Sequence, residues 1–285
     1  MSAVNPFANL AEAIPRNPMI AIAAWPGVGK SVYLYSVLAA KGIKPHEVAF
    51  FSVEVGAFTA ALINDEVQPW LRNHGIPPAE SLYPPEGEEL GDGHLRIFPV
   101  STYDTLMETV ETEIFAPGRI GKPKYRVVCF DTATEIGLLF AHQHDALRGA
   151  LVNFRQVHGE WLDFLWKLEA SGICTIFAVH LADELEKPEV NVADGKATAK
   201  QMARKSAALR EHQDKILPDI MGTRARTTFM KKMHLYIYLT RKHGDRIIGY
   251  TETQYTGEWA KKRTGIPDMF EDLTLGEVME LGHWL

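Results

Sequence analysis

Cysteine is scarce in this chain of 285 residues, which contains two. Cys129 and Cys174 each lie in an apolar run, so we expect both to be buried and unpaired, as in a protein of a reducing cytoplasm. Long apolar runs are also missing. None approaches the about 18 residues that a membrane span requires, and the N-terminus lacks a basic stretch followed by an apolar one. We therefore expect neither a membrane span nor a secretion signal.

An excess of basic residues is likewise absent. The chain carries 30 Lys and Arg against 36 Asp and Glu, a formal net charge of −6. This balance argues against a globally basic nucleic-acid binder, so any nucleic-acid site must be local. With 46% hydrophobic residues, the chain can bury a substantial core in one large domain, with room for an insertion and a tail.

What the chain does contain is a glycine-bearing turn between an apolar strand and a helical pattern, in residues 19–31. A strand, a tight turn and a helix that opens on Lys-Ser form the P-loop arrangement, in which backbone N–H groups surround phosphate oxygens. Ala24 replaces the usual first glycine, at a position that closes the strand. The pattern predicts a nucleoside triphosphate site, with ATP and Mg²⁺ as cofactors. Its expected contacts are Pro26, Gly27, Val28, Gly29, Lys30, Ser31 and Val32.

Apolar strand-like runs alternate with helical patterns along the rest of the chain. The expected strands are 20–24, 48–56, 95–100, 125–132, 173–180, 233–240 and 246–251. The expected helices are 30–41, 57–72, 101–115 (an S-x-x-D start), most of 133–171, and 275–281. This order predicts an α/β fold, a mainly parallel twisted sheet with helices on both faces, and an antiparallel strand pair at the C-terminal edge. Ligands of such sheets bind at the carboxyl ends of the strands.

Three polar residues stand at those carboxyl ends. Asp131 follows an apolar strand about 100 residues after the P-loop, the Walker B position, where it would hold Mg²⁺ through a water, beside Ser31. Glu54 could orient or deprotonate an attacking water, or could simply favour a helix N-terminus. His180 could sense the γ-phosphate, or could be a satisfied structural residue.

Two basic clusters follow later in the chain. Residues 191–232 contain ten Lys or Arg, and the five proposed DNA contacts among them are Lys196, Lys200, Arg204, Lys205 and Arg210. A solvated amphipathic helix over 201–216 is the alternative. Lys261 and Arg263 form the second cluster, which either stabilises charge on a neighbouring subunit's nucleotide or is simply solvated.

His142, His144 and Asp145 form an H-x-H-D cluster that could suggest a metal. No second group of ligands stands at a convincing spacing, so we expect these residues on a helix surface.

Taken together, these segments resemble the RecA superfamily. Residues 51–55, with Glu54, resemble the S-L-E-M segment of replicative helicases and circadian-clock ATPases, in which the glutamate is the catalytic base. Residues 127–132 resemble their Walker B strand, and residues 176–180 resemble their sensor strand, which ends in His or Gln. Residues 258–263 resemble the A-K-x-R segment of phage RecA-like ATPases; the related K-x-R pair of hexameric motors reaches the neighbour's nucleotide.

Overall, residues 18–265 are most similar to phage RecA-like ATPases of the single-strand-annealing recombinase type. The chain departs from the family in Ala24, in Trp25 and in the length of the loop after His180. The resemblance implies an oligomeric ATPase, a ring or filament that binds single-stranded DNA in the host cytoplasm. Glu54, Lys30, His180, Lys261 and Arg263 would be its catalytic residues.

The expected organisation is an N-terminal arm (1–18), a RecA-like core (19–270) with a DNA-binding insertion (181–218), and a C-terminal tail (271–285). Two other functions remain open. One is a hexameric motor or translocase for DNA or peptide, and the other is an ATP-dependent switch or scaffold without nucleic acid. A small-molecule kinase would leave Glu54, His180 and the late basic pair unexplained.

Overall fold

The computed structural model describes residues 17–53, 65, 67–78, 82, 91–117, 122–148, 154–183, 216–218, 220, 223–241, 247–251 and 265–284. Its strands are β1 (Met19–Ala24), β2 (Val48–Ser52), β3 (Arg96–Pro99), β4 (Val127–Asp131), β5 (Cys174–Asp183), β6 (Ile216–Pro218), β7 (Leu235–Arg241), β8 (Ile247–Tyr250) and β9 (Met269–Glu271). Its helices are α1 (Lys30–Tyr35), α3 (Gln68–Asn73), α4 (Tyr103–Val110), α6 (Ala133–Arg148), α7 (Phe154–Ala170), α9 (Thr223–Lys232) and α11 (Leu275–Leu281). Short 3₁₀ turns, η2 (Ser36–Ala39) and η3 (Pro45–Glu47), and a π-helical turn, η5 (Glu111–Phe115), accompany them.

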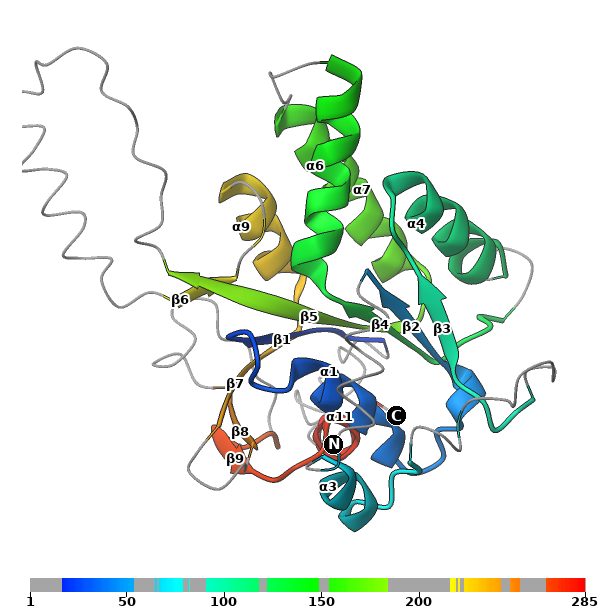
Figure 1. Ribbon diagram of the computed structural model, residues 1–285, viewed down its shortest axis with the longest axis vertical. Helices are drawn as coiled ribbons and strands as arrows, with labels where there is room; N and C mark the ends of the chain where they lie inside the picture. Colours follow the sequence, from blue (N-terminus) through cyan, green and yellow to red (C-terminus); the bar gives the residue numbers. More distant parts are fainter. Residues whose placement is uncertain are drawn as a thin grey trace, which may run out of the picture.

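The strands form one sheet in the order β3-β2-β4-β5-β1-β7-β8-β9, with β6 paired to β5 (Figure 1). The six strands β3, β2, β4, β5, β1 and β7 are parallel. Strands β8 and β9 join as antiparallel strands at the edge, and β6 pairs antiparallel with β5. Strand β5 lies between β1 and β4, so the P-loop strand and the Asp131 strand are not direct neighbours. The expected fold class is confirmed: a mainly parallel sheet, with antiparallel strands at the C-terminal edge.

Helices cover both faces of the sheet. On one face α1, η2, α3 and α11 enclose a core to which alternate strand residues contribute, among them Ile22, Phe50 and Cys129. On the other face α4, α6, α7 and α9 pack over a core rich in aromatic rings, such as Phe130 and Trp161. Successive strand side chains point to opposite faces, and both faces are covered by helices. The central strands are therefore apolar almost throughout.

Several sequence expectations are confirmed closely, and others need correction. Both cysteines are buried and unpaired, and α11 covers the expected 275–281. Strand β5 continues three residues beyond His180, because residues 181–183 pair with β6, a strand that we did not expect. The helix expected from Ser101 is capped instead by Thr102, whose hydroxyl accepts the Thr105 N–H at 3.1 Å. No described helix is long and apolar enough to cross a membrane.

The expectation for the H-x-H-D cluster is half wrong. His142 is exposed on α6, but His144 is 2% exposed. Its Nε2 lies 2.9 Å from a carboxylate oxygen of Glu160 on α7, which also accepts from the Tyr103 hydroxyl at 3.2 Å. The Glu160 carboxylate thus joins α7 to α6 through His144 and to α4 through Tyr103. Sequence spacing along one helix could not reveal those partners.

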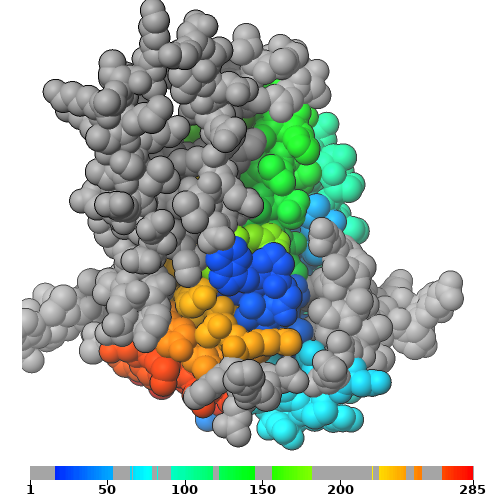
Figure 2. Space-filling model, turned by 60° about the vertical axis from the view of Figure 1, so that its left-hand side comes forward, coloured from blue at the N-terminus to red at the C-terminus, as the bar shows by residue number. Residues whose placement is uncertain are grey.

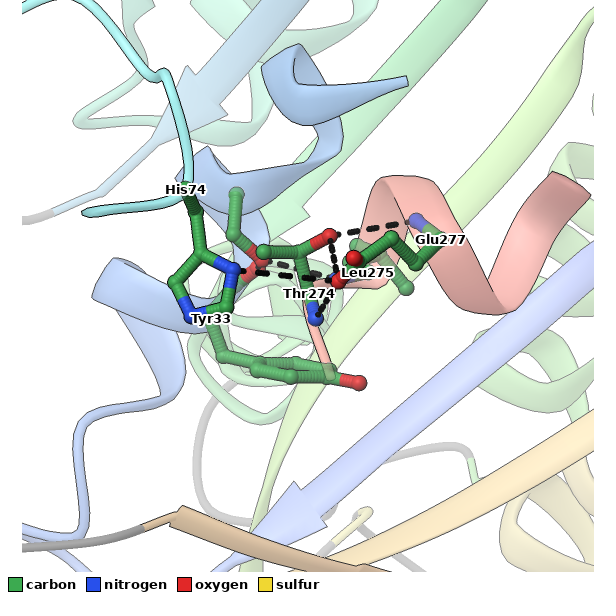
Figure 3. Close-up of polar contacts among 6 residues, drawn as sticks. Tyr33, His74, Thr274, Leu275 and Glu277 are labelled. Carbon is green, nitrogen blue, oxygen red and sulfur yellow. Dashed lines mark hydrogen bonds and ion pairs between the residues drawn. The ribbon is translucent and has the colours of Figure 1, made fainter. Parts of the chain in front are cut away.

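Helix α11 is held against the α1 side of the sheet by polar contacts (Figure 3). The Thr274 hydroxyl accepts from the Glu277 N–H at 3.1 Å, and the Glu277 carboxylate accepts from the Thr274 N–H at 2.7 Å, which forms a capping box. The Leu275 N–H donates to the Ser36 hydroxyl at 2.8 Å. Burial, with Glu277 nearby, raises the pKa of the Tyr33 hydroxyl well above its usual value. The chain's last helix is therefore part of the core beside the P-loop helix.

Two glycine substitutions should have opposite effects on stability, one where α11 closely approaches the end of η2 and one on the open surface of α7. A Cβ on Gly276 would lie 2.3 Å from the Ala40 backbone nitrogen, so Gly276→Ala should destabilise the fold by about 1–3 kcal/mol. Gly159 is exposed within α7, and a Cβ there meets nothing within 4 Å. Gly159→Ala should therefore stabilise by about 0.5–1 kcal/mol. Urea unfolding measures both; a Gly276→Ala protein as stable as wild type would contradict the tight packing.

Candidate nucleotide site

The loop between β1 and α1 has the backbone that a P-loop requires. Gly27 and Gly29 have φ values of 79° and 102°, in the left-handed region that glycine adopts without strain. The Val28 N–H donates to the Trp25 carbonyl at 3.3 Å and closes the turn. Pro26 and Gly27 are exposed. Figure 2 shows this N-terminal segment, in blue, at the molecular surface beside the orange β7–β8 segment.

Lys30 is buried although it carries a charge. Its side-chain Nζ donates to the carbonyl oxygens of Ala24, at 3.0 Å, and Trp25, at 3.2 Å. The residue is 6% exposed. Burial lowers its pKa to about 8, and the Asp131 carboxylate partly opposes that shift. The ammonium is thus held at the base of the loop, where the strand ends.

Ser31 and Asp131 meet across the intervening strand. The Ser31 hydroxyl donates to Oδ2 of Asp131 at 2.7 Å, although the two residues are 100 positions apart. Asp131 is 7% exposed. A hydroxyl and a carboxylate in direct contact supply the oxygen ligands that Mg²⁺ prefers. The donor set therefore fits the cation that the sequence predicts.

Other strand ends share the face of the sheet on which α1 lies. Ser52 pairs in register with Asp131, and His180 pairs with Ala24. Residues two and four positions earlier in each strand belong to the α1-side core, for example Phe50, Cys129 and Ala178. By the alternation of strand side chains, Ser52, Asp131 and His180 belong to that same face. The His180 N–H also donates to the Thr134 hydroxyl at 3.0 Å, which joins β5 to the start of α6.

Some predicted residues lie outside the described part of the chain. They are Glu54, Lys261, Arg263 and the five basic residues of the 181–218 segment: Lys196, Lys200, Arg204, Lys205 and Arg210. The residue before Glu54 is described, and the Val53 N–H donates to the Asp131 carbonyl at 3.2 Å. The chain therefore runs beside Asp131 immediately before it reaches Glu54.

The described end of the basic segment faces away from the loop. Lys232, at the end of α9, forms an ion pair with Glu169 and lies 3.3 Å from the centre of the Trp166 ring on α7. These three residues line a surface cavity of about 510 Å³. Because α7 ends just before β5 and α9 just before β7, the cavity lies toward the amino ends of the parallel strands. Lys232 therefore contributes to α7–α9 packing.

Two residues near the site were missed by sequence reasoning. Arg241 ends β7, and its Nε donates to the carbonyl of Val28 in the loop at 3.1 Å. Ser52 falls within the 51–55 segment, but the sequence assigns it no role. It is fully buried beside Asp131, and its hydroxyl has no hydrogen-bond partner among the described residues. The usable signal is strand phase: Arg241 follows Leu235, Ile237 and Leu239, which all face the α1-side core.

Elsewhere in the described ranges, no group of three or more His, Cys, Asp or Glu could hold a metal ion. The fold and the site together define an α/β protein with a strand–loop–helix of the P-loop type, in which the loop serine contacts a strand-end aspartate.

Comparisons with known proteins find structural likeness only. No protein-family model matches the sequence, and no curated protein gives a significant match. Among solved structures, the chain is similar to the RadB recombinase (TM-score 0.44, 11% identity), with 83% of this chain and 80% of that chain covered. It is also similar to a second solved structure, an ATPase domain (TM-score 0.47, 13% identity), with 94% of this chain and 84% of that chain covered. Both likenesses are remote.

The lowered pKa of Lys30 predicts a pH dependence of stability. Between about pH 8 and the ordinary lysine value of 10.5, the unfolded chain holds a proton that the folded protein has released. Stability conferred by this group therefore rises with pH across that window, by about 3 kcal/mol at most. Below pH 8 the buried ammonium remains a net cost.

Urea unfolding at several pH values between 7 and 10.5 measures this effect as the difference between wild type and Lys30→Met. That difference should shift in favour of wild type as the pH rises. Lys41→Met is the control, because Lys41 is exposed. Parallel curves for wild type and Lys30→Met would contradict the assignment.

Proposed function

We propose that the chain is a Mg²⁺-dependent ATPase of the RecA type that assembles into a ring or filament and acts on single-stranded DNA in recombination or annealing. The single observation that carries the nucleotide assignment is the 2.7 Å contact between the Ser31 hydroxyl and Asp131. It joins the first residue after the P-loop lysine to the end of an apolar strand, the two places from which P-loop proteins hold Mg²⁺.

Each residue of the site has a distinct role in this proposal. The loop 26–29 surrounds the phosphates with backbone N–H groups, and Lys30 neutralises phosphate charge. Ser31 and Asp131 hold Mg²⁺, which supplies charge stabilisation at the phosphate oxygens when bound. Glu54 orients or deprotonates the attacking water, and His180 couples the site to the 181–218 segment, whose basic residues contact DNA.

Lys261 and Arg263 act on the nucleotide of a neighbouring subunit in this scheme. The segment that carries them departs from and returns to the sheet edge, where the Thr251 N–H donates to the Asp268 carbonyl at 2.8 Å. A cation supplied in trans can be worth about 10³ to 10⁵ in rate.

Mixing inactive Arg263→Ala subunits with inactive Lys30→Ala subunits should restore turnover, because each supplies what the other lacks. Failure of the mixture would remove the arrangement in trans.

An ATPase assay with and without single-stranded DNA, beside a size measurement with a non-hydrolysable ATP analogue, tests the function as a whole. We expect hydrolysis to be stimulated by DNA, binding to weaken with salt, and the oligomer to form with the analogue. A motor would in addition unwind or translocate. Turnover that ignores DNA, with no salt-dependent binding, would instead support a switch or scaffold.

The role of Glu54 predicts a separation of binding from turnover. Glu54→Gln should bind MgATP as wild type does and lose about 10²- to 10⁴-fold in kcat, because the amide cannot accept a proton. Glu47→Gln is the matched control, since Glu47 directly precedes β2 and pairs with Arg126 at 3.6 Å. Calorimetry and phosphate release measure the two properties. Wild-type turnover in Glu54→Gln would remove the catalytic assignment.

A further inference from the structure

The last residue of β7 reaches the P-loop of its own subunit. Arg241 Nε donates to the Val28 carbonyl at 3.1 Å, over a separation of 213 residues. Its Nη2 lies 3.5 Å from the position that a Cβ on Gly29 would occupy. The guanidinium therefore lies against Val28 and Gly29, the two residues that precede Lys30. In Figure 2 the β7–β8 segment, in orange, lies beside the segment that contains the loop, in blue.

The same strand contacts the loop a second time, on the other face of the sheet. The Trp25 side chain hydrogen-bonds the Tyr238 hydroxyl, and because an indole N–H can only donate, the Tyr238 oxygen accepts. The Tyr238 ring in turn stacks on Tyr250 of β8, with ring centres 6.1 Å apart. Tyr238 thus contacts Trp25, the first residue of the loop, and Arg241 contacts Val28 near the end of the loop.

We propose that Arg241 is a positioning residue for nucleotide binding, which fixes the orientation of the Val28–Gly29 peptide. This inference rests on the proposed function. The Val28 carbonyl and the Gly29 N–H belong to one planar trans peptide, so they point in opposite directions. A guanidinium that holds the Val28 carbonyl toward itself therefore fixes the Gly29 N–H to point away from Arg241, the side on which this proposal places phosphate.

Two physical effects make this contact relevant to affinity. Gly29, at φ 102°, is free to adopt several backbone conformations, and a contact that selects one lowers the ordering cost of binding. A carbonyl that accepts from a charged donor also polarises its peptide, which makes the N–H on the other side a better donor. Arg241 then strengthens phosphate binding without touching the nucleotide.

Arg126 offers a matched control for this role. It is exposed, as Arg241 is, and its Nη1 donates to a loop carbonyl, that of Gly42, at 2.7 Å. Gly42, like Gly29, has a positive φ, of 78°. The Arg126 contact lies between the end of η2 and the start of β4, away from the P-loop. Loss of either arginine removes one charged donor from one loop carbonyl, but only one of the two loops surrounds phosphate.

The test measures dissociation constants for MgATP and MgADP by calorimetry, together with thermal unfolding midpoints of the same proteins. Arg241→Ala should weaken both nucleotides about tenfold, with the unfolding midpoint unchanged because Arg241 is exposed. Arg126→Ala should bind both as wild type does. Arg241→Lys should remain weakened, because the lysine ammonium keeps the charge but not the fixed geometry of the guanidinium.

Three results would overturn the inference while leaving the proposed function intact. Wild-type affinity in Arg241→Ala would show that the contact is immaterial. Full recovery in Arg241→Lys would show that charge alone acts. Loss of MgATP affinity alone, with MgADP unchanged, would indicate direct contact with the γ-phosphate instead of positioning of the loop. By contrast, a wild-type protein that binds neither nucleotide would overturn the proposed function, and this inference with it.

Discussion

The site depends on one constraint, the common phase and register of the parallel strands where they end. Ala24 pairs with His180, and Ser52 pairs with Asp131 two residues earlier along the sheet, so these strands bring polar residues of the same phase to one edge. A shift of one residue in any of them would turn its polar end to the other face. The hydrogen bond from Ser31 to Asp131 forms only when β4 and β1 agree across β5. The apolar strand interiors enforce that agreement, because a slip would expose or mispack an entire core face.

The same constraint explains what the sequence could predict. The strands, the P-loop and Asp131 follow from local patterns, since an apolar run that ends on a polar residue can be read without knowing its neighbours. The run that ends on Arg241 has the same form, but the importance of this residue depends on which face α1 covers and on β7 pairing beside β1, and the sequence alone shows neither. His144 was misjudged for a similar reason. Its partner Glu160 comes from α7, and Glu160 in turn accepts from Tyr103 of α4. Periodicity within α6 carries no information about either residue.

The buried position of the Lys30 ammonium at the end of β1 lowers the stability of the fold but prepares the site to bind an anion. A buried ammonium held by two carbonyl oxygens is costly, and its lowered pKa expresses that cost. The Asp131 carboxylate offsets part of it, and the same carboxylate accepts from Ser31. In the proposed function a triphosphate brings further negative charge to this place, so ligand binding would relieve the penalty. The residues that destabilise the fold at this site are those that would make the site selective for an anion with a divalent cation.

The strands at the sheet edge connect the P-loop to the residues proposed to act on a neighbour. Strand β7 contacts the loop through Arg241, β8 pairs with β7, and β9 pairs with β8 in register from Ile248 to Tyr250. The chain that carries Lys261 and Arg263 leaves from Thr251 and returns at Asp268, so both of its ends are fixed to this edge. If those cations act in trans, the hydrogen-bonded edge strands fix their base relative to the subunit's own loop. Parallel pairing of β7 with β1 would then serve both ends of the mechanism, since it holds the subunit's own nucleotide loop and sets where the cations for the next subunit begin.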